Sequence, residues 1–430
     1  MTQNFSTRRQ FLRSTTAWGL SSSALALHLS ADRASGADQP PVPATAAPGP
    51  PRDTADKIIP GKDARLIVHS PRPGEIETPL ELLRAHSVTP QELMFVRNNQ
   101  FPADALTLEP DPNAAAWSLS IGGMPTPVVA TTVEQLRELP QTELEVVLQC
   151  SGNSRSLFHS AAPVEGVPWQ QGAMANVVFG GVRLQDLFRH LKITPPPDAR
   201  FLTAAGADPI YKPGSDDFEH SVPLADALAR GLLALTLNGG PLPRVHGGPL
   251  RLVMPGYYAT MHVKWLNNLL LADQESTNHH HVGRYRTPLE PIAPGQKFTS
   301  TLANSEPNWR MKIKSVIFAP LPGEQLRPDQ RGQVELRGVA WNDGRSPLET
   351  VQLSLDEGRT WLTTELASPA SPYAWHPWRL AVKLLPGKHT LLARAIDALG
   401  RTQPRDGATA AWNPAGYAWN GVDTVTFTVG

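Results

Sequence analysis

The chain has 430 residues, with 39 basic and 39 acidic side chains, so its formal charge at pH 7 is zero. This balance provides no basic field for nucleic acid or an anionic membrane. A single cysteine excludes an intrachain disulfide, a multi-cysteine zinc site and an iron–sulfur cluster. The length suggests two or three domains, and 43 prolines, 33 glycines and 11 tryptophans favour a loop-rich, largely β protein.

Residues 1–37 indicate an export signal. Arg8 and Arg9 lie in a twin-arginine pattern, an apolar stretch follows at residues 17–27, and Ser35-Gly36-Ala37 offers a small-residue cleavage site. The apolar stretch is too short and too rich in serine to span a bilayer, so we expect no membrane span in the mature form. These features predict a periplasmic protein that is exported already folded; a basic disordered terminus is the alternative. The Pro/Ala-rich residues 38–57 predict a flexible tether.

The next residues predict alternating short elements. Thr78-Pro79 is a start signal for a helix over residues 80–84, and apolar positions 184, 187, 188 and 191 fall at helical spacing. Apolar, β-branched runs predict strands over residues 92–97, 143–149, 201–208, 232–237 and 250–254, with a hairpin over residues 117–129. Further short helices are expected over residues 133–139 and 222–228.

Cys150 directly follows the predicted strand over residues 143–149, and the turn formers Ser151 to Ser154 come next. The thiol is therefore predicted at the rigid edge of a strand, where side chains are often exposed for chemistry. Arg155 favours a reactive or metal-ligating thiolate, because a nearby cation lowers the pKa of a thiol. From spacing alone, a buried structural thiol fits equally well.

The chain changes character after residue 276. Residues 276–305 are polar and predict a domain boundary. Within them, His279-His280-His281 could bind a metal, but three consecutive side chains cannot easily aim at one ion, so a solvated loop is favoured. From Lys312 onward, alternating segments such as residues 351–355 and 387–397 predict an immunoglobulin-like β-sandwich of about 120 residues with a packing or dimerisation role.

Several motifs, in order and at compatible spacing, resemble the sulfite oxidase family of molybdenum enzymes over nearly all the chain after residue 75. They are Phe95-Val-Arg97-Asn98, Cys150-Ser-Gly-Asn-Ser-Arg155, Val167-Pro-Trp169-Gln-Gln-Gly172, Gly206-Ala-Asp208, Ser221-Val-Pro-Leu224, Asn238-Gly-Gly-Pro-Leu-Pro243, His246-Gly with Arg251, His262-Val-Lys264-Trp265, Ser354-Leu-Asp-Glu-Gly-Arg-Thr-Trp361 and Trp412-Asn-Pro. The resemblance implies an α+β fold: a mixed, largely β sulfite-oxidase-type molybdopterin domain over residues 58–295, followed by an immunoglobulin-like dimerisation domain over residues 305–430.

The resemblance also implies roles for individual residues. Cys150 is expected to be the thiolate ligand of a molybdenum–molybdopterin cofactor with one pterin, since a soft thiolate suits such a metal. Arg97, Arg155, Trp169 and Tyr285 match the pocket that binds the substrate anion. The positions that match the pterin and phosphate site are Phe95, Arg97, Asn98, Asn99, Asp208, His246, Arg251, His262, Val263 and Lys264.

The implied reaction is oxidation of sulfite to sulfate by oxygen-atom transfer. We expect the electrons to pass to a separate periplasmic c-type cytochrome, because the chain has neither a Cys-x-x-Cys-His haem motif nor a cytochrome b5-like segment. A homodimer, or a heteromer with a cytochrome subunit, is expected. Tyr285 would steer electron or proton flow.

Two departures from the family pattern leave the substrate open. Asn99 stands where the family has histidine, and the resemblance implies that Thr424 replaces a further pocket arginine. The molybdenum subunit of a sulfane dehydrogenase, which acts on protein-bound sulfur, is therefore the close alternative. A methionine-sulfoxide-reductase-like role is disfavoured, because that branch lacks the C-terminal sandwich. A thiol hydrolase that uses Cys150 and a histidine, or a non-catalytic binding protein, are alternatives of other classes.

Overall fold

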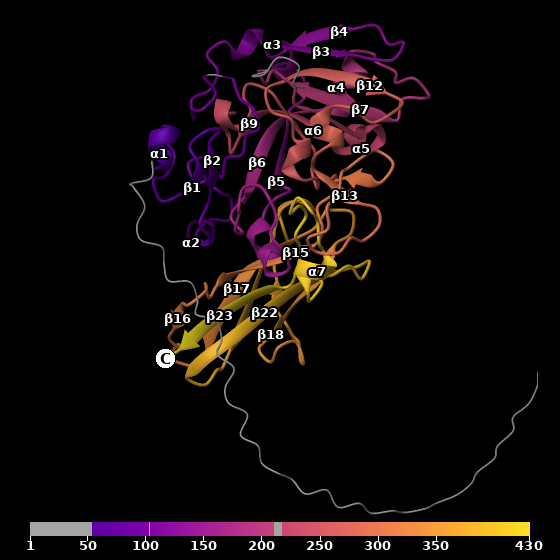
Figure 1. Cartoon of the computed structure of the whole chain (residues 1–430). Helices are drawn as coiled ribbons and strands as arrows, with labels where there is room; N and C mark the ends of the chain where they lie inside the picture. Colours follow the sequence, from indigo (N-terminus) through magenta and orange to yellow (C-terminus); the bar gives the residue numbers. More distant parts are fainter. Residues whose placement is uncertain (1–53, 103, 210–216) are drawn as a thin grey trace, which may run out of the picture. The chain divides into compact units, whose positions relative to one another are not determined.

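Two five-stranded sheets organise the chain before residue 280 (Figure 1). The computed structural model describes residues 54–102, 104–209 and 217–430, so the predicted signal peptide and residues 38–53 of the predicted tether lie outside the described residues. The first sheet has the order β10-β9-β6-β5, with β11 also paired to β9, and the second has the order β4-β3-β12-β7-β8. Their strands are β3 (Ser118–Gly122), β4 (Val129–Thr132), β5 (Thr142–Gln149), β6 (Met174–Arg183), β7 (Phe201–Gly206), β8 (Glu219–Pro223), β9 (Leu232–Leu237), β10 (Gly240–Pro241), β11 (Arg251–Val253) and β12 (Leu266–Ala272).

Short helices cover these sheets with apolar faces. Leu184, Leu187 and Phe188 of α4 are buried in one core cluster with β7 and β12 residues such as Leu202 and Leu269. This is the packing that the helical spacing of residues 184–191 predicts. The helices and helical turns of this part are α1 (Ala55–Ile58), α2 (Leu80–Leu83), η1 (Ala114–Ala116), α3 (Val133–Arg137), η2 (Arg155–Ser160), α4 (Leu184–His190), α5 (Leu224–Arg230), η3 (Arg244–His246), η4 (Ala259–Met261) and α6 (His279–Val282).

The C-terminal part is a sandwich of two sheets, with the strand orders β15-β17-β21-β20 and β16-β23-β22-β18-β19. Alternate residues of each strand face a shared core that contains Leu336, Val351, Trp378 and Phe427. The predicted fold class is therefore confirmed. The remaining elements are β1 (Ile67–Ser70), β2 (Glu75–Glu77), β13 (Arg286–Pro288), β14 (Ser305–Pro307), β15 (Lys314–Ala319), β16 (Gln325–Leu326), β17 (Val334–Trp341), β18 (Leu348–Ser354), β19 (Leu362–Thr363), β20 (Glu365–Leu366), β21 (His376–Val382), β22 (Gly387–Asp397), α7 (Gly407–Ala410) and β23 (Asp423–Val429).

The predicted strand over residues 92–97 is wrong. Pro90 begins a turn, since Leu93 N and Met94 N both donate to its carbonyl, at 3.0 and 3.1 Å. Only Val96 forms an isolated bridge, with Ile76. Leu93 and Met94 are buried in different core clusters, so the apolar run serves two cores rather than the face of one strand.

Two other expectations also differ from the structure. His279-His280-His281 is not a solvated loop: the side chain of Asn278 caps α6 by accepting from His280 N, and His280 and His281 are buried. Within the described residues no group of three or more His, Cys, Asp or Glu side chains is placed to hold a metal ion, there or elsewhere. Ala55 of α1 is fully buried, so the last residues of the predicted tether are helical and packed rather than flexible.

The loop that carries Cys150 is held from the C-terminal part of the chain. Trp341 Nε1 of β17 donates to Gln149 Oε1 at 2.9 Å, and Ala418 N donates to Ser151 O at 2.7 Å. Lys314 of β15 is 2% exposed and donates to Ser154 Oγ at 2.7 Å. The sandwich therefore positions residues on both sides of Cys150, in addition to any role in assembly.

We predict a pH-dependent contribution of Lys314 to stability. Burial lowers the pKa of Lys314 to about 7, and Asp423 only partly opposes this effect. An unfolded lysine titrates near about 10.4, so the unfolded chain binds more protons between these pH values and stability rises with pH across that interval. We expect the free energy of unfolding to rise from pH 7 to pH 10 by on the order of 2 kcal/mol more in the wild type than in Lys314→Met, since one pKa unit corresponds to about 1.4 kcal/mol.

Urea unfolding at a series of pH values measures this difference. Lys388→Met, which removes an exposed lysine of β22, is the matched control and should follow the wild type. Parallel pH curves for the wild type and Lys314→Met would contradict the prediction.

Candidate functional site

Cys150 lies where two cavities meet. The inner cavity has about 670 Å³ of empty space and the outer cavity about 2050 Å³, both including space that is open to solvent. Cys150, Arg97 and Tyr285 line both. The thiol is 7% exposed, so it is neither on the open surface nor sealed in an apolar core. The geometry gives one sulfur atom access to two separate spaces.

The end of β5 fixes the backbone of Cys150. Cys150 N donates to Ala173 O at 2.9 Å, which continues the β5–β6 pairing, and Asn153 N donates back to Cys150 O at 3.0 Å. A side chain at Gly152 would lie 2.6 Å from Nη2 of Arg155, so glycine there allows the guanidinium to fold back against the loop. The predicted strand-to-loop position of Cys150 is therefore confirmed.

Arg155 acts on the thiol in the predicted direction, but burial outweighs its effect in the protein alone. Burial raises the pKa of Cys150, and Arg97 and Arg155 only partly oppose that effect. Desolvation of a thiolate exceeds the attraction of two guanidinium groups that are themselves largely paired. A metal cation is a stronger local charge and deprotonates a thiol that coordinates it.

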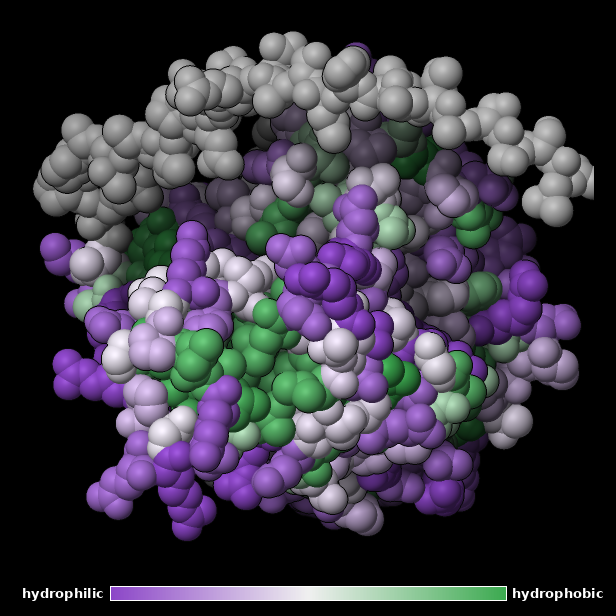
Figure 2. Space-filling view, turned by 90° about the horizontal axis from the view of Figure 1, so that it is seen from below, coloured by the Kyte–Doolittle hydropathy of each residue, from purple (hydrophilic) through white to green (hydrophobic). Residues whose placement is uncertain are grey.

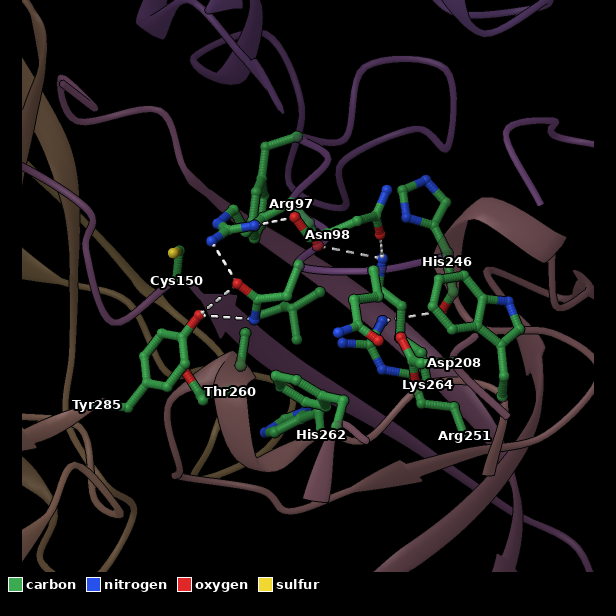
Figure 3. A pocket seen from close by; sticks show the side chains of 17 residues that line it. Arg97, Asn98, Cys150, Asp208, His246, Arg251, Thr260, His262, Lys264 and Tyr285 are labelled. Carbon is green, nitrogen blue, oxygen red and sulfur yellow. Dashed lines mark hydrogen bonds between the residues drawn. The ribbon is translucent and has the colours of Figure 1, made fainter. Parts of the chain in front are cut away.

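The inner cavity has cations at the end away from Cys150 (Figure 3). Lys264 Nζ donates to Asn98 Oδ1 at 2.6 Å and to Val245 O at 2.8 Å, and Arg251 Nη1 donates to His246 O at 2.9 Å. Burial lowers the pKa of Lys264 well below its usual value. A bound anion would offset the cost of burying these two basic groups in one cavity.

Several polar atoms in this cavity have no hydrogen-bond partner within the described part of the chain, although they are buried. They include Asp208 Oδ2 and Arg251 Nε. Buried polar atoms without a partner are rare in native proteins and call for a ligand or water. Burial first, and Asp217 next, raise the pKa of Asp208 to about 8, and burial lowers the pKa of His262 to about 3. A neutral acid and a neutral imidazole can hydrogen-bond the edge of a polar heterocycle.

These groups fit a pterin that carries a phosphate. Arg251 and Lys264 supply the positive charge that a phosphate requires, while Asp208 offers an unpaired polar atom to the ring and His262 lines the same cavity. Cys150 at the opposite end offers a soft ligand for the metal. The residues present therefore suit the cofactor that the sequence implies.

Asn99 links two residues of the predicted anion pocket. Its Nδ2 donates to the Tyr285 hydroxyl at 2.8 Å, and its Oδ1 accepts from Arg97 Nη2 at 2.7 Å. The asparagine thus connects Arg97 and Tyr285 at the position where the family pattern has histidine. Tyr285 adopts the left-handed backbone conformation, with φ at +56°, a conformation that is uncommon for a non-glycine residue and is often found at functional sites.

The outer cavity is lined by several charged side chains. Arg155 is 6% exposed; its Nε donates to Ala415 O at 3.0 Å, its Nη1 donates to Val167 O at 2.9 Å, and it lies over the Tyr417 ring. Trp169 is fully buried, and its Nε1 has no partner within the described residues. Both side chains line the cavity, as the resemblance predicts, and the unpaired indole N–H is a ready donor for an anion.

The structure brings together all but one of the predicted site residues. Phe95, Arg97, Asn98, Asn99, Asp208, His246, Arg251, His262 and Lys264 line the inner cavity, and Arg97, Arg155, Trp169 and Tyr285 line the outer one. Val263 does not: its side chain is fully buried in the core cluster between sheet and helices, because it points away from its two neighbours. The roles of the cavity-lining residues toward a cofactor or substrate are predictions.

The assignment of Thr424 to the pocket is wrong. Thr424 lies on β23, where it pairs with Leu392 of β22. Its side chain is exposed, while the side chains of its neighbours Asp423 and Val425 point inward. The C-terminal residues that reach the outer cavity are Trp412, Pro414, Ala415 and Tyr417, none of them basic. Successive side chains of a β-strand point to opposite faces, so Thr424 points away from its two neighbours, and the loop before β23 reaches the outer cavity instead.

Sequence reasoning missed other residues of the outer cavity. They are His69, Glu75, Glu165, Arg284, Lys297 and Tyr417. Arg284 directly precedes the predicted site residue Tyr285, so its place in the sequence could have identified it. The others come from segments far apart in the chain, and no local pattern marks them.

Comparison with known proteins agrees with this geometry. Residues 107–280 match the family model "Oxidoreductase molybdopterin binding domain", and residues 305–425 match "Mo-co oxidoreductase dimerisation domain". The chain is 31% identical to chicken sulfite oxidase over 375 residues, which cover 84% of this chain and 78% of that enzyme. The chain belongs to the sulfite oxidase family of molybdenum oxidoreductases.

Other members show the breadth of this family. The mitochondrial sulfite oxidase of Drosophila melanogaster is 32% identical, and the match covers 84% of this chain but only 63% of that enzyme. Barley nitrate reductase is 28% identical over a similar part of this chain. The crystal structure of the sulfane dehydrogenase SoxCD from Paracoccus pantotrophus superposes with a TM-score of 0.66 at 26% identity, covering 81% of this chain and 83% of that one.

We predict that Lys264 is needed to retain the cofactor. Lys264→Met should lower the affinity for a molybdenum–pterin group at least about tenfold, because a charge-assisted hydrogen bond contributes about 1.5–3 kcal/mol. Metal analysis and pterin fluorescence of the purified protein measure the occupancy. Lys383→Met, at an exposed position of the sandwich, is the control. Equal cofactor content in both variants would show that Lys264 has no part in binding.

Proposed function

We propose that this protein is a periplasmic molybdenum-dependent sulfite dehydrogenase that oxidises sulfite to sulfate and passes the electrons to a separate c-type cytochrome. The observation that carries the proposal is the position of Cys150 between a cavity suited to a pterin and a cavity lined by cations. A molybdenum–pterin group in the inner cavity would supply two-electron oxygen-atom transfer chemistry.

The cations of the outer cavity select for an oxyanion. Arg97 reaches the junction of the two cavities, and its partner Glu75, with Nη1 to Oε1 at 3.4 Å, orients it without fully surrounding it. The two carbonyls that accept from Arg155 fix the plane of its guanidinium and leave its charge in place. Arg284 and Lys297 extend the positive field toward solvent, where it attracts a small dianion.

Tyr285 lies at the junction of the two cavities. It lines both cavities, and its hydroxyl is hydrogen-bonded to Asn99, which also binds Arg97. A proton at this hydroxyl can therefore respond to charge that changes beside Arg97. The fixed network supports a role for Tyr285 in proton or electron flow.

The surroundings of the site support a partnered protein. The match of residues 305–425 to a dimerisation domain favours a homodimer or a heteromer with a cytochrome. Figure 2 shows apolar residues gathered on one face and surrounded by hydrophilic ones. Leu362, Leu385 and Leu399 of the sandwich are 44–80% exposed. Large exposed apolar areas often mark protein contacts.

The periplasmic location rests on the sequence. The twin-arginine pattern at Arg8-Arg9, followed by an apolar stretch and a small-residue cleavage site, supports export. Among the described residues, no helix combines the length and the apolar character that a membrane crossing requires.

A sulfane dehydrogenase that acts on protein-bound sulfur is the second candidate. The outer cavity, about 2050 Å³, is far larger than a sulfite ion and is open. Its C-terminal wall, Trp412 to Tyr417, presents aromatic and small residues rather than an additional cation. The similarity to SoxCD points in the same direction.

Steady-state assays separate the two candidates. The proposed function predicts reduction of ferricyanide or cytochrome c by free sulfite, with kcat/KM within the usual enzymatic range of about 10⁴–10⁸ M⁻¹s⁻¹. The second candidate predicts no turnover of free sulfite, but reduction of the enzyme by a cysteine persulfide on a peptide. Turnover of neither substrate by a molybdenum-loaded protein would contradict both.

We predict that Cys150→Ser abolishes sulfite oxidation. A serine hydroxyl stays protonated near neutral pH and is a poor ligand for a soft metal site, so activity should fall at least about a thousandfold. Tyr285→Phe is the comparison variant, because it keeps Cys150 and should slow turnover while the metal stays bound. Sulfite turnover by Cys150→Ser at more than a tenth of the wild-type rate would disprove the ligand assignment.

A further inference from the structure

A β-bulge directs His69 toward the outer cavity. His69 lies in β1, which pairs antiparallel with β2; Val68 pairs with Ile76 and Ser70 with Glu75, so the register shifts at His69. A bulge of this kind turns the side chain of the extra residue out of its expected direction and is frequent beside active sites. His69 lines the outer cavity, and its side chain is 11% exposed.

His69 forms a pair with a buried carboxylate. Nε2 of His69 lies 2.7 Å from Oε2 of Glu77, and Glu77 is 1% exposed. The same carboxylate accepts from Gly172 N at 2.7 Å and from Gln170 N at 3.1 Å. A carboxylate that accepts from these backbone donors is the acceptor toward the imidazole as well, so in the neutral ring this pairing favours the hydrogen on Nε2 and leaves the Nδ1 lone pair available.

Nδ1 is left open to the cavity. It makes no hydrogen bond to the protein within the described residues, and it is not among the fully buried polar atoms. The imidazole packs edge-to-face on the Trp169 ring, with the ring centroids 4.9 Å apart. Glu77 therefore ties His69 to the backbone that directly follows Trp169, a residue that lines the outer cavity.

No other imidazole lines the outer cavity in the described part of the chain. The charged groups that face the same space are Glu75, Arg97, Arg155, Glu165, Arg284 and Lys297, together with the Cys150 thiol and the Tyr285 hydroxyl. Glu75 is paired with Arg97. An imidazole is the side chain best suited to exchange protons near neutral pH.

Oxidation of a sulfite ion with water yields sulfate, two protons and two electrons. The electrons leave to the external one-electron acceptor, so two protons must leave through the cavity. We propose that His69 is the first proton acceptor of the outer cavity: Nδ1 takes one of these protons, and Glu77 stabilises the imidazolium. The proton then passes to solvent water in the open cavity, and the second proton follows by the same route. This inference rests on the proposed function.

The tautomer is the first test, and it needs no turnover. In protein labelled with ¹⁵N-histidine, long-range ¹H–¹⁵N correlation spectra, assigned with the His69→Asn variant, should show the hydrogen on Nε2 and a bare Nδ1 at alkaline pH. A hydrogen on Nδ1 in the neutral ring would overturn the inference, because that nitrogen could then accept no proton.

Kinetics of the molybdenum-loaded enzyme provide the second test. His69→Asn should lower kcat about 10- to 100-fold while metal content stays equal to that of the wild type, since a positioned general base contributes at least this much. His190→Asn, at an exposed position of α4, is the matched control and should not change the rate. Added imidazole should restore part of the rate of His69→Ala, because the cavity can admit it, and should restore nothing to His190→Asn.

The outcomes distinguish the two levels of the proposal. If the wild type oxidises sulfite and His69→Asn keeps the full rate and pH profile, the inference about His69 fails and the proposed function stands. If the wild type carries the cofactor but does not oxidise sulfite, the proposed function fails, whatever the tautomer of His69.

Discussion

The structure depends on the attachment of one loop to two parts of the chain. Residues 150–155 extend from β5, whose pairing with β6 fixes Cys150 from one side. Trp341, Lys314 and the backbone at residues 415–418 hold the loop from the sandwich. Because most of these contacts are buried, loss of one leaves an unsatisfied polar group, and the position of the sulfur is strongly determined. The sandwich is thus part of the active-site scaffold.

The two cavities explain how one fold separates cofactor from substrate. The inner cavity is narrow and holds basic groups whose burial is unfavourable without an anion, and several of its polar atoms have no partner within the described residues. The outer cavity is wide, and in its wall Arg155 is paired to carbonyls and Arg97 to a carboxylate. The inner cavity therefore suits a cofactor that stays bound, and the outer cavity suits a substrate that enters and leaves. The width of the outer cavity limits the size of the molecule that can reach Cys150.

Much of this could be predicted from the sequence, for identifiable reasons. The strand before Cys150, the α4 helix and the alternating C-terminal strands have strong periodicity, and tertiary packing agrees with it. The run at residues 92–97 misled, because its apolar residues serve two cores instead of one strand face. Arg97 and Cys150 were found through motifs, but His69, Lys297 and Tyr417 reach the cavity from distant segments, and only the fold brings them together. The bulge at His69 and the outward direction of Thr424 depend on how their strands pair with neighbouring strands. A single sequence does not reveal this pairing register.

The central claim is that the single thiol of this protein bonds a metal held in the inner cavity. X-ray absorption at the molybdenum edge tests it most directly, with the wild-type protein and Cys150→Ser prepared with equal metal content. The account predicts one sulfur neighbour fewer around the metal in Cys150→Ser than in the wild type. An unchanged number of sulfur neighbours, or a wild-type protein that binds no molybdenum after normal maturation, would contradict it.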